Sequence, residues 1–100
     1  MQHTIVLIQP GRPDTRCYSD FETVTDAMEG IVEIFEAKLR KDNPDALSIS
    51  YDLGQLFSFI DSLKDLACLA YDYGINAYAP YSKDWIKEKI YLLFRENSEN

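Results

Sequence analysis

The 100-residue sequence is poor in the residue types that build catalytic and metal sites. It contains one histidine, His3, and two cysteines, Cys17 and Cys68, whose separation lacks the spacing of a zinc site. Nucleophilic catalysis needs a serine or cysteine with a base within reach, and the lone histidine lies beside the N-terminus. The four glycines are isolated, so they form no phosphate-binding loop. We therefore expect no catalytic residues, no metal site and no cofactor.

Long apolar runs and clusters of basic residues are missing as well. No stretch approaches the roughly 18 apolar residues that cross a membrane, and the first residues lack the basic start of a signal peptide. Lys and Arg total 10 against 17 Asp and Glu, which gives a net charge of −7. Because nucleic-acid-binding surfaces cluster basic residues, we expect no direct nucleic-acid ligand. The composition predicts a soluble, intracellular protein with free thiols. Its acidic surface serves either solubility alone, which is the simpler interpretation, or the binding of basic partner segments.

The residues that are present predict a single α+β domain over residues 1–100. Apolar residues make up 46% of the chain, and their spacing switches between the two-residue period of strands and the 3.6-residue period of helices. The predicted order is β-β-α-α-β-β-α, a four-stranded antiparallel sheet with three helices on one face. The expected strands are residues 3–9, 15–19, 66–71 and 77–81. The expected helices are one that ends near residue 42, one over 50–63, and one that follows residue 82 and frays at 96–100.

The first helix is predicted to begin at Ser19 or Asp20. Glu22 follows Ser19 by three residues, which is the spacing of a capping box. Apolar residues then recur at steps of three and four, as they do on the buried side of a helix. This stripe consists of Phe21, Val24, Met28, Ile31, Phe35 and Leu39.

The first strand is apolar on both of its faces, and this feature predicts a dimer. Alternation places Ile5 and Leu7 on one face and Val6 and Ile8 on the other. Helices on one side of the sheet can cover only one of these pairs, and a two-fold dimer would cover the other. The alternative is a monomer that tolerates scattered exposed aliphatic residues. The expected dimer interface comprises His3, Ile5, Leu7, Gln9, Arg16 and Tyr18.

Two hydroxyl groups are candidates for phosphorylation. Ser19 and Thr23 each stand three residues before an acidic residue, Glu22 and Asp26 respectively. Acid-directed kinases prefer this pattern, and a phosphate near a helix N-terminus is tolerated or stabilising.

Three runs of sequence resemble the enhancer of rudimentary family. They are residues 3–10 (HTIVLIQP), 51–61 (YDLGQLFSFID) and 80–91 (PYSKDWIKEKIY), and the resemblance continues in register to about Arg95. The resemblance implies a four-stranded antiparallel sheet that dimerises through its open face. It places Ile5 and Leu7 at the central dimer contacts, with His3, Arg16 and Tyr18 beside them.

The same resemblance implies a non-enzymatic nuclear adaptor, which can also be cytoplasmic. Members of the family bind short segments of proteins in RNA processing, including splicing, and are linked to the cell cycle and pyrimidine metabolism. A dimer would present two equivalent binding grooves, although no motif identifies their residues. Cys17 stands where many relatives carry a phosphorylatable threonine, and Thr23 replaces a serine, so regulation and partner choice can differ.

Two other functions remain open from the sequence. Seven tyrosines would suit a small dimeric α+β enzyme with a tyrosine-lined pocket, and a deep polar cavity holding an acid of perturbed pKa would favour it. Direct RNA binding through aromatic residues of the sheet is opposed by the net charge.

Overall fold

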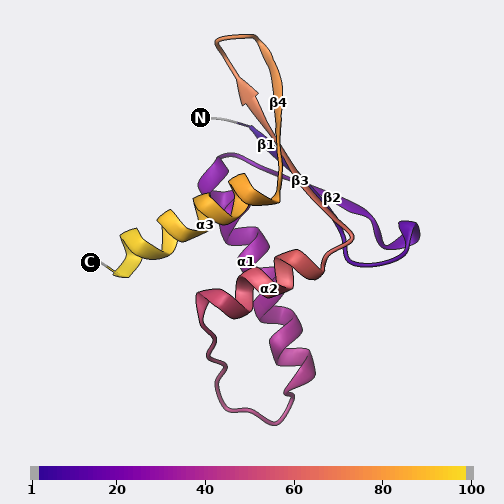
Figure 1. The fold of residues 1–100 in the computed structure, drawn as a ribbon, viewed down its shortest axis with the longest axis vertical. Helices are drawn as coiled ribbons and strands as arrows, with labels where there is room; N and C mark the ends of the chain where they lie inside the picture. The colour runs from indigo at the N-terminus through magenta and orange to yellow at the C-terminus, as the bar shows by residue number, and fades with distance from the viewer. Residues whose placement is uncertain (1–2, 99–100) are drawn as a thin grey trace.

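The computed structural model describes residues 3–98, in which four strands and three α-helices follow one another in the predicted order (Figure 1). The strands are β1 (Thr4–Gln9), β2 (Cys17–Phe21), β3 (Asp65–Asp72) and β4 (Ala77–Tyr81). The helices are α1 (Val24–Asp42), α2 (Leu53–Ser62) and α3 (Lys83–Ser98), and a 3-10 turn, Pro13–Thr15, precedes β2. The predicted α+β class is therefore confirmed.

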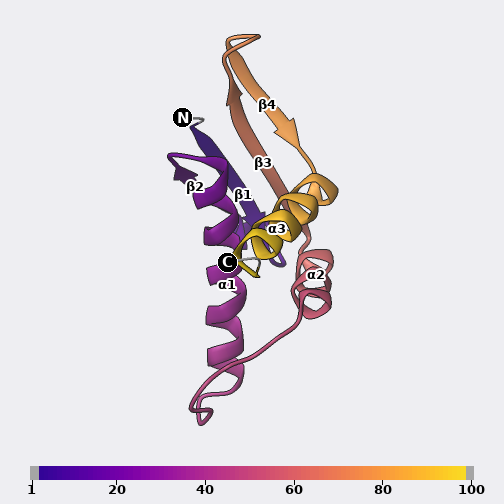
Figure 2. The same cartoon turned by 90° about the vertical axis from the view of Figure 1, so that its left-hand side faces the viewer.

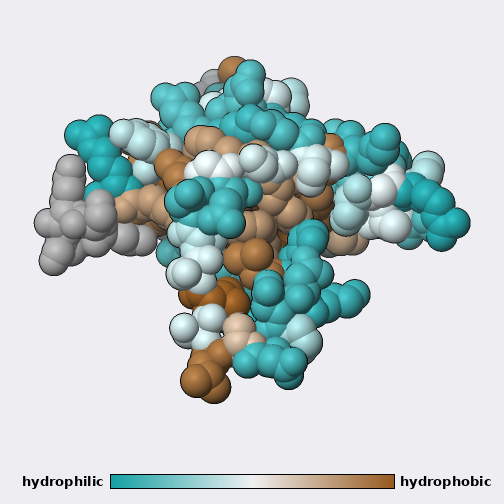
Figure 3. All heavy atoms as spheres, turned by 60° about the horizontal axis from the view of Figure 1, so that its bottom comes forward, coloured by the Kyte–Doolittle hydropathy of each residue, from teal (hydrophilic) through white to brown (hydrophobic). Residues whose placement is uncertain are grey.

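The four strands form one antiparallel sheet in the order β2-β1-β3-β4. The helices lie on one side of this sheet, and the β3–β4 hairpin projects beyond them at one end (Figure 2). At the other end of the molecule the loop after α1 projects, carrying both apolar and polar side chains (Figure 3). This architecture leaves the second side of the sheet without a covering helix.

The two sides of β1 are buried to different extents. Thr4, Val6 and Ile8 face the helices and are 0%, 2% and 4% exposed, whereas Ile5 and Leu7 on the other side are half-buried. Successive side chains of a strand point to opposite faces, so one strand contributes to both surfaces. The residues facing the helices join a core that consists mainly of Met28, Ile31, Phe35, Leu56, Ile60, Leu66, Cys68, Ile86 and Ile90.

The start of α1 differs from its predicted position. Its N-cap is Thr23, whose side chain accepts a hydrogen bond from the Asp26 N–H at 3.0 Å. Ser19 and Asp20 instead lie in β2, where Ser19 pairs with Val6 and the strand continues to Phe21. Pairing with β1 therefore overrides the local capping pattern of Ser19, and β2 lies two residues later than predicted because the 3-10 turn occupies the expected start.

Helix α2 begins three residues later than the expected range of 50–63, whereas α3 begins where expected. Asp52 caps α2 and forms a capping box with Gln55, each side chain accepting from the other's backbone N–H at 2.8 and 2.9 Å. Helix α3 begins directly after Ser82 and continues to Ser98, beyond Glu96 where the tail was expected to fray. Residues 99 and 100 of that tail lie outside the described residues.

A close approach between α1 and β2 depends on Gly30. A Cβ atom built on Gly30 would lie 2.6 Å from Cζ of Phe21, well inside normal contact distance. The absence of a side chain lets the ring of Phe21 rest on the helix. Gly30 thus allows the edge strand β2 to pack closely against α1.

Candidate protein-interaction surface

The side of the sheet that faces away from the helices, called the open face below, has an apolar centre. Ile5 of β1 lies opposite Leu69 of β3, and Leu69 lies opposite Pro80 of β4. In the next row Leu7 lies between Tyr18 of β2 and Ala67 of β3. Tyr18 is 66% exposed. The strand register therefore assembles one continuous apolar patch from all four strands.

One end of the open face is held by His3. Its Nδ1 lies 2.6 Å from the Tyr78 hydroxyl, and its Nε2 lies 3.2 Å from Asp20 Oδ2. The ring of Tyr78 also meets the ring of Tyr71 edge to face at 5.2 Å. Both ring nitrogens of His3 are thus engaged by residues of the open face, which favours a structural role over that of a general base for a nucleophile.

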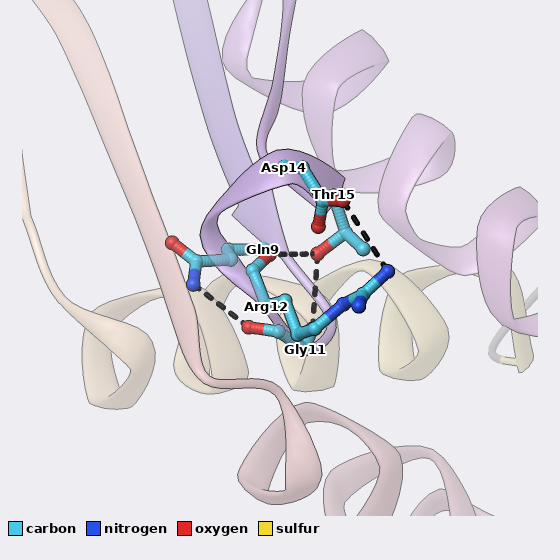
Figure 4. Close-up of polar contacts among 5 residues, drawn as sticks. All are labelled: Gln9, Gly11, Arg12, Asp14 and Thr15. Carbon is cyan, nitrogen blue, oxygen red and sulfur yellow. Dashed lines mark hydrogen bonds and ion pairs between the residues drawn. The ribbon is translucent and has the colours of Figure 1, made fainter.

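The opposite end of the open face is held by Gln9 and Arg16. The Arg16 guanidinium donates from Nε and Nη2 to Gln9 Oε1 at 3.0 and 2.8 Å. Gln9 Nε2 in turn donates to the Gly11 carbonyl at 2.8 Å (Figure 4). These contacts fix the side chain of Gln9, which is only 8% exposed.

The turn between β1 and β2 is tied together by its own polar groups. The Thr15 hydroxyl donates to the Arg12 carbonyl at 2.6 Å and accepts from the Gly11 N–H at 3.1 Å, while Arg12 reaches Asp14 at 3.3 Å (Figure 4). The turn therefore fixes the point at which Arg16 returns towards Gln9.

The sequence of the chain matches one family of known proteins. A family profile described as "Enhancer of rudimentary" matches residues 1–100. The chain belongs to the enhancer of rudimentary family.

Curated members of the enhancer of rudimentary family align with nearly the whole chain. Protein enhancer of rudimentary from Drosophila virilis is 56% identical over 97 residues, covering 96% of this chain and 93% of that protein. The homologue from Dictyostelium discoideum is 50% identical over 91 residues, with coverages of 90% and 91%. The homologue from Arabidopsis thaliana is 46% identical over 92 residues, with coverages of 90% and 84%. The resemblance seen in the sequence is confirmed, and these names state no enzymatic activity.

In this member of the enhancer of rudimentary family, the structure groups the predicted interface residues on one surface. His3, Ile5, Leu7, Gln9, Arg16 and Tyr18 all lie on or at the border of the open face. Sequence reasoning missed the contributions of β3 and β4, namely Ala67, Leu69, Tyr71, Tyr78 and Pro80. The alternation of residues 66–71 could have identified the β3 residues of the open face. Leu66, Cys68 and Ala70 are buried, and the residues between them point to the opposite side of the sheet.

The candidate modification and thiol residues occupy contrasting places. Ser19 is exposed on the edge strand β2, and Thr23 is the partly exposed N-cap of α1. Both cysteines are free: Cys17 is exposed, and Cys68 is buried in the core. Burial raises the pKa of the Cys68 thiol to about 11, so this residue remains a neutral, unreactive thiol at neutral pH.

The helical side contains two grooves. A groove of about 620 Å³ between α1 and α2 is lined by Phe35, Leu39 and Phe59 together with polar side chains. A smaller groove of about 240 Å³ lies between α1 and α3. Within residues 3–98 there is no group of three or more His, Cys, Asp or Glu side chains that could hold a metal ion. In the same range no helix has the length and apolar character that would let it cross a membrane.

Proposed function

We propose that the chain forms a two-fold homodimer through its open face and acts as a non-enzymatic adaptor. The observation that carries this proposal is the half-burial of Ile5 and Leu7 at the centre of a sheet side that no helix of the chain covers. Full burial of an Ile or Leu side chain stabilises a protein by about 1.5–3 kcal/mol. A second copy packed on the same surface would complete that burial for both chains at once.

The surroundings of the apolar centre support an interface between proteins. Tyrosines and an arginine border it, and such residues are enriched at protein interfaces. Tyr71 meets both Tyr73 and Tyr78 edge to face, at 4.9 and 5.2 Å. These rings lie on a hairpin that projects from the body of the molecule (Figure 1), an arrangement that suits docking better than an enclosed enzyme pocket.

The adaptor function rests on family membership together with this dimer. We propose that the dimer works in the nucleus, and also in the cytoplasm, and binds short segments of RNA-processing proteins. Two identical sites per dimer would hold two partner chains together and raise the affinity for partners that are themselves linked. The links to splicing, the cell cycle and pyrimidine metabolism would follow from which partners are brought together.

The dimer is tested by sedimentation of the wild type beside an Ile5→Arg, Leu7→Arg variant. We expect the wild type to sediment as a dimer and the variant as a folded monomer, because two buried charges oppose the apolar contact. The matched control is Ile34→Arg, Leu47→Arg, which adds the same charge at exposed positions away from the open face and should remain dimeric. A monomeric wild type, or a variant that dimerises as tightly as the wild type, contradicts the proposal.

A milder substitution keeps this test decisive if the double arginine variant fails to fold. Leu7→Ser should weaken the dimer measurably in sedimentation while circular dichroism shows the native helical signal. An unchanged dimerisation constant would contradict the proposed interface.

The adaptor function is tested in cells by proximity labelling with the dimeric control and the dimer-deficient variant. We expect the control to label nuclear RNA-processing proteins and the deficient variant to lose most of them. Equal labelling by both proteins would separate partner binding from dimerisation and contradict the bivalent mechanism.

A further inference from the structure

The groove between α1 and α3 is a second apolar surface, and it lies outside the proposed dimer interface. Its apolar lining comes from Val32 of α1 and from Leu93 and Phe94 of α3. Leu93 and Phe94 are only partly buried against the core. The groove lies between α1 and α3, and these helices lie on one side of the sheet (Figure 2). A dimer formed through the opposite side of the sheet would leave the groove open.

Carboxylates border this apolar groove. Glu29, Glu33 and Glu36 of α1 line it, and none of its lining residues is basic. Glu29 and Glu33 are exposed and form no ion pair or hydrogen bond within residues 3–98. On the neighbouring stretch of α3, the Lys89 ammonium lies over the Trp85 ring at 5.4 Å from its centroid. The charged residues that line the groove are therefore all acidic.

Tyr51 fixes the remaining carboxylate at the end of the groove. Its hydroxyl donates to Glu36 Oε2 at 2.6 Å, and its ring meets Phe35 edge to face at 5.0 Å. Burial, followed by the hydrogen bond and the charge of Glu36, raises the pKa of Tyr51 to about 12. Tyr51 thus stays a neutral donor at physiological pH, which leaves Glu29 and Glu33 as the carboxylates available to a ligand.

We propose that the α1–α3 groove binds a basic, apolar segment of another protein, with an aliphatic side chain against Leu93 and Phe94 and two cations at Glu29 and Glu33. The proposal rests on the adaptor function proposed above and names the chemistry of its partner. Charge selects the occupant, because the carboxylates of the groove repel the phosphates of a nucleic acid and attract a basic segment.

The spacing of the carboxylates restricts the arrangement of the partner's cations. Glu29 and Glu33 are four residues apart in a helix, which corresponds to a rise of about 6 Å. Two arginines at four-residue spacing in a helical segment, or at two-residue spacing in an extended one, span a similar distance. The expected motif is therefore a pair of basic residues at one of these spacings. In the helical case an aliphatic residue three positions after the first basic residue lies on the same face.

The binding test uses fluorescence anisotropy of a short labelled peptide and the full chain. In the probe peptide two arginines stand four residues apart with one leucine between them, on a background of alanine and glutamine. We expect Glu29→Gln, Glu33→Gln to weaken binding by about tenfold, since two exposed charge pairs are lost. The matched control is Glu22→Gln, Glu88→Gln, which removes the same charge at exposed positions outside the groove and should bind as the wild type does.

Two further peptides separate the groove from general charge attraction. Replacing leucine by serine should weaken binding, and replacing both arginines by glutamate should abolish it. Equal losses in the two double variants, equal binding of the serine peptide, or no binding of the probe to the wild type would overturn the proposal.

Sedimentation distinguishes this inference from the dimer proposal. The Glu29→Gln, Glu33→Gln variant should remain as dimeric as the wild type. The folded Ile5→Arg, Leu7→Arg monomer should still bind one probe peptide per chain, because its groove lies within one subunit. Loss of probe binding together with loss of the dimer would contradict a groove formed by a single chain.

Discussion

On β1, Val6 and Ile8 are 2% and 4% exposed, whereas their neighbours Ile5 and Leu7 are half-buried. All four are aliphatic and belong to one central strand, so neither composition nor position in the sheet explains the difference. Coverage explains it, because the three helices pack on one side of the sheet and no helix of residues 3–98 packs on the other (Figure 2). The comparison shows that the apolar pattern of a strand can encode an internal core and an external contact together.

The largest expected effect compares Ile8→Ala with Ile5→Ala. Ile8→Ala should lower the free energy of unfolding by about 2–5 kcal/mol, because it leaves a cavity in the packed core. Ile5→Ala should cost less at low protein concentration, where the open face is exposed, and more at high concentration, where the dimer forms. Urea unfolding at two protein concentrations measures both effects. Equal, concentration-independent losses in the two variants would show that the two faces do not differ in this way.

A smaller effect is expected at the edge of the sheet, where Phe21 faces the helices and Tyr18 faces the open side. Gly30→Ala would place a methyl group 2.6 Å from the Phe21 ring in the present packing, so the ring must move. We expect a loss of about 1–3 kcal/mol in the free energy of unfolding, reduced by alanine's better helix propensity.

Gly54→Ala provides the matched control for this prediction. A Cβ at Gly54 would meet only Asp52 Oδ1 at 3.3 Å, so the better helix propensity of alanine should leave the thermal stability unchanged or slightly raised. A Gly30→Ala variant as stable as Gly54→Ala would show that the contact between the Phe21 ring and Gly30 is not tight.

The two faces also differ in how well the sequence predicted them. The alternation of β1 separated Ile5 and Leu7 from Val6 and Ile8, and the family resemblance placed Ile5 and Leu7 on the open face. The open-face residues of β3 and β4 were not assigned, since their membership depends on strand order and register, and these arise from tertiary pairing. The α1–α3 groove could not be predicted from the sequence either, because it forms between residues more than 50 positions apart, such as Val32 and Leu93.

Ser19 shows why a local signal can fail. Its spacing to Glu22 fits a capping box, yet Ser19 pairs with Val6 in the sheet. The backbone hydrogen bonds of a strand and the burial of Phe21 outweigh one side-chain cap, which is worth about 1 kcal/mol. A single sequence does not reveal this competition, because the partner of Ser19 is Val6, which lies on the neighbouring strand β1.

The smallest effect tests this reassignment directly. Thr23→Ala should lower the free energy of unfolding by about 1 kcal/mol, because the Asp26 N–H loses its side-chain acceptor. Ser19→Ala should change stability by less than about 0.5 kcal/mol, since Ser19 is exposed. Chemical denaturation of the two variants measures the difference, and Thr23→Ser serves as the control because it keeps the acceptor oxygen. A larger loss of stability for Ser19→Ala than for Thr23→Ala would contradict this assignment. It would indicate that Ser19 caps α1, as the sequence predicted, and does not pair with β1. The same measurement bears on regulation, because a phosphate on Thr23 would replace the capping hydroxyl, whereas a phosphate on Ser19 would lie on an exposed strand and leave the cap intact.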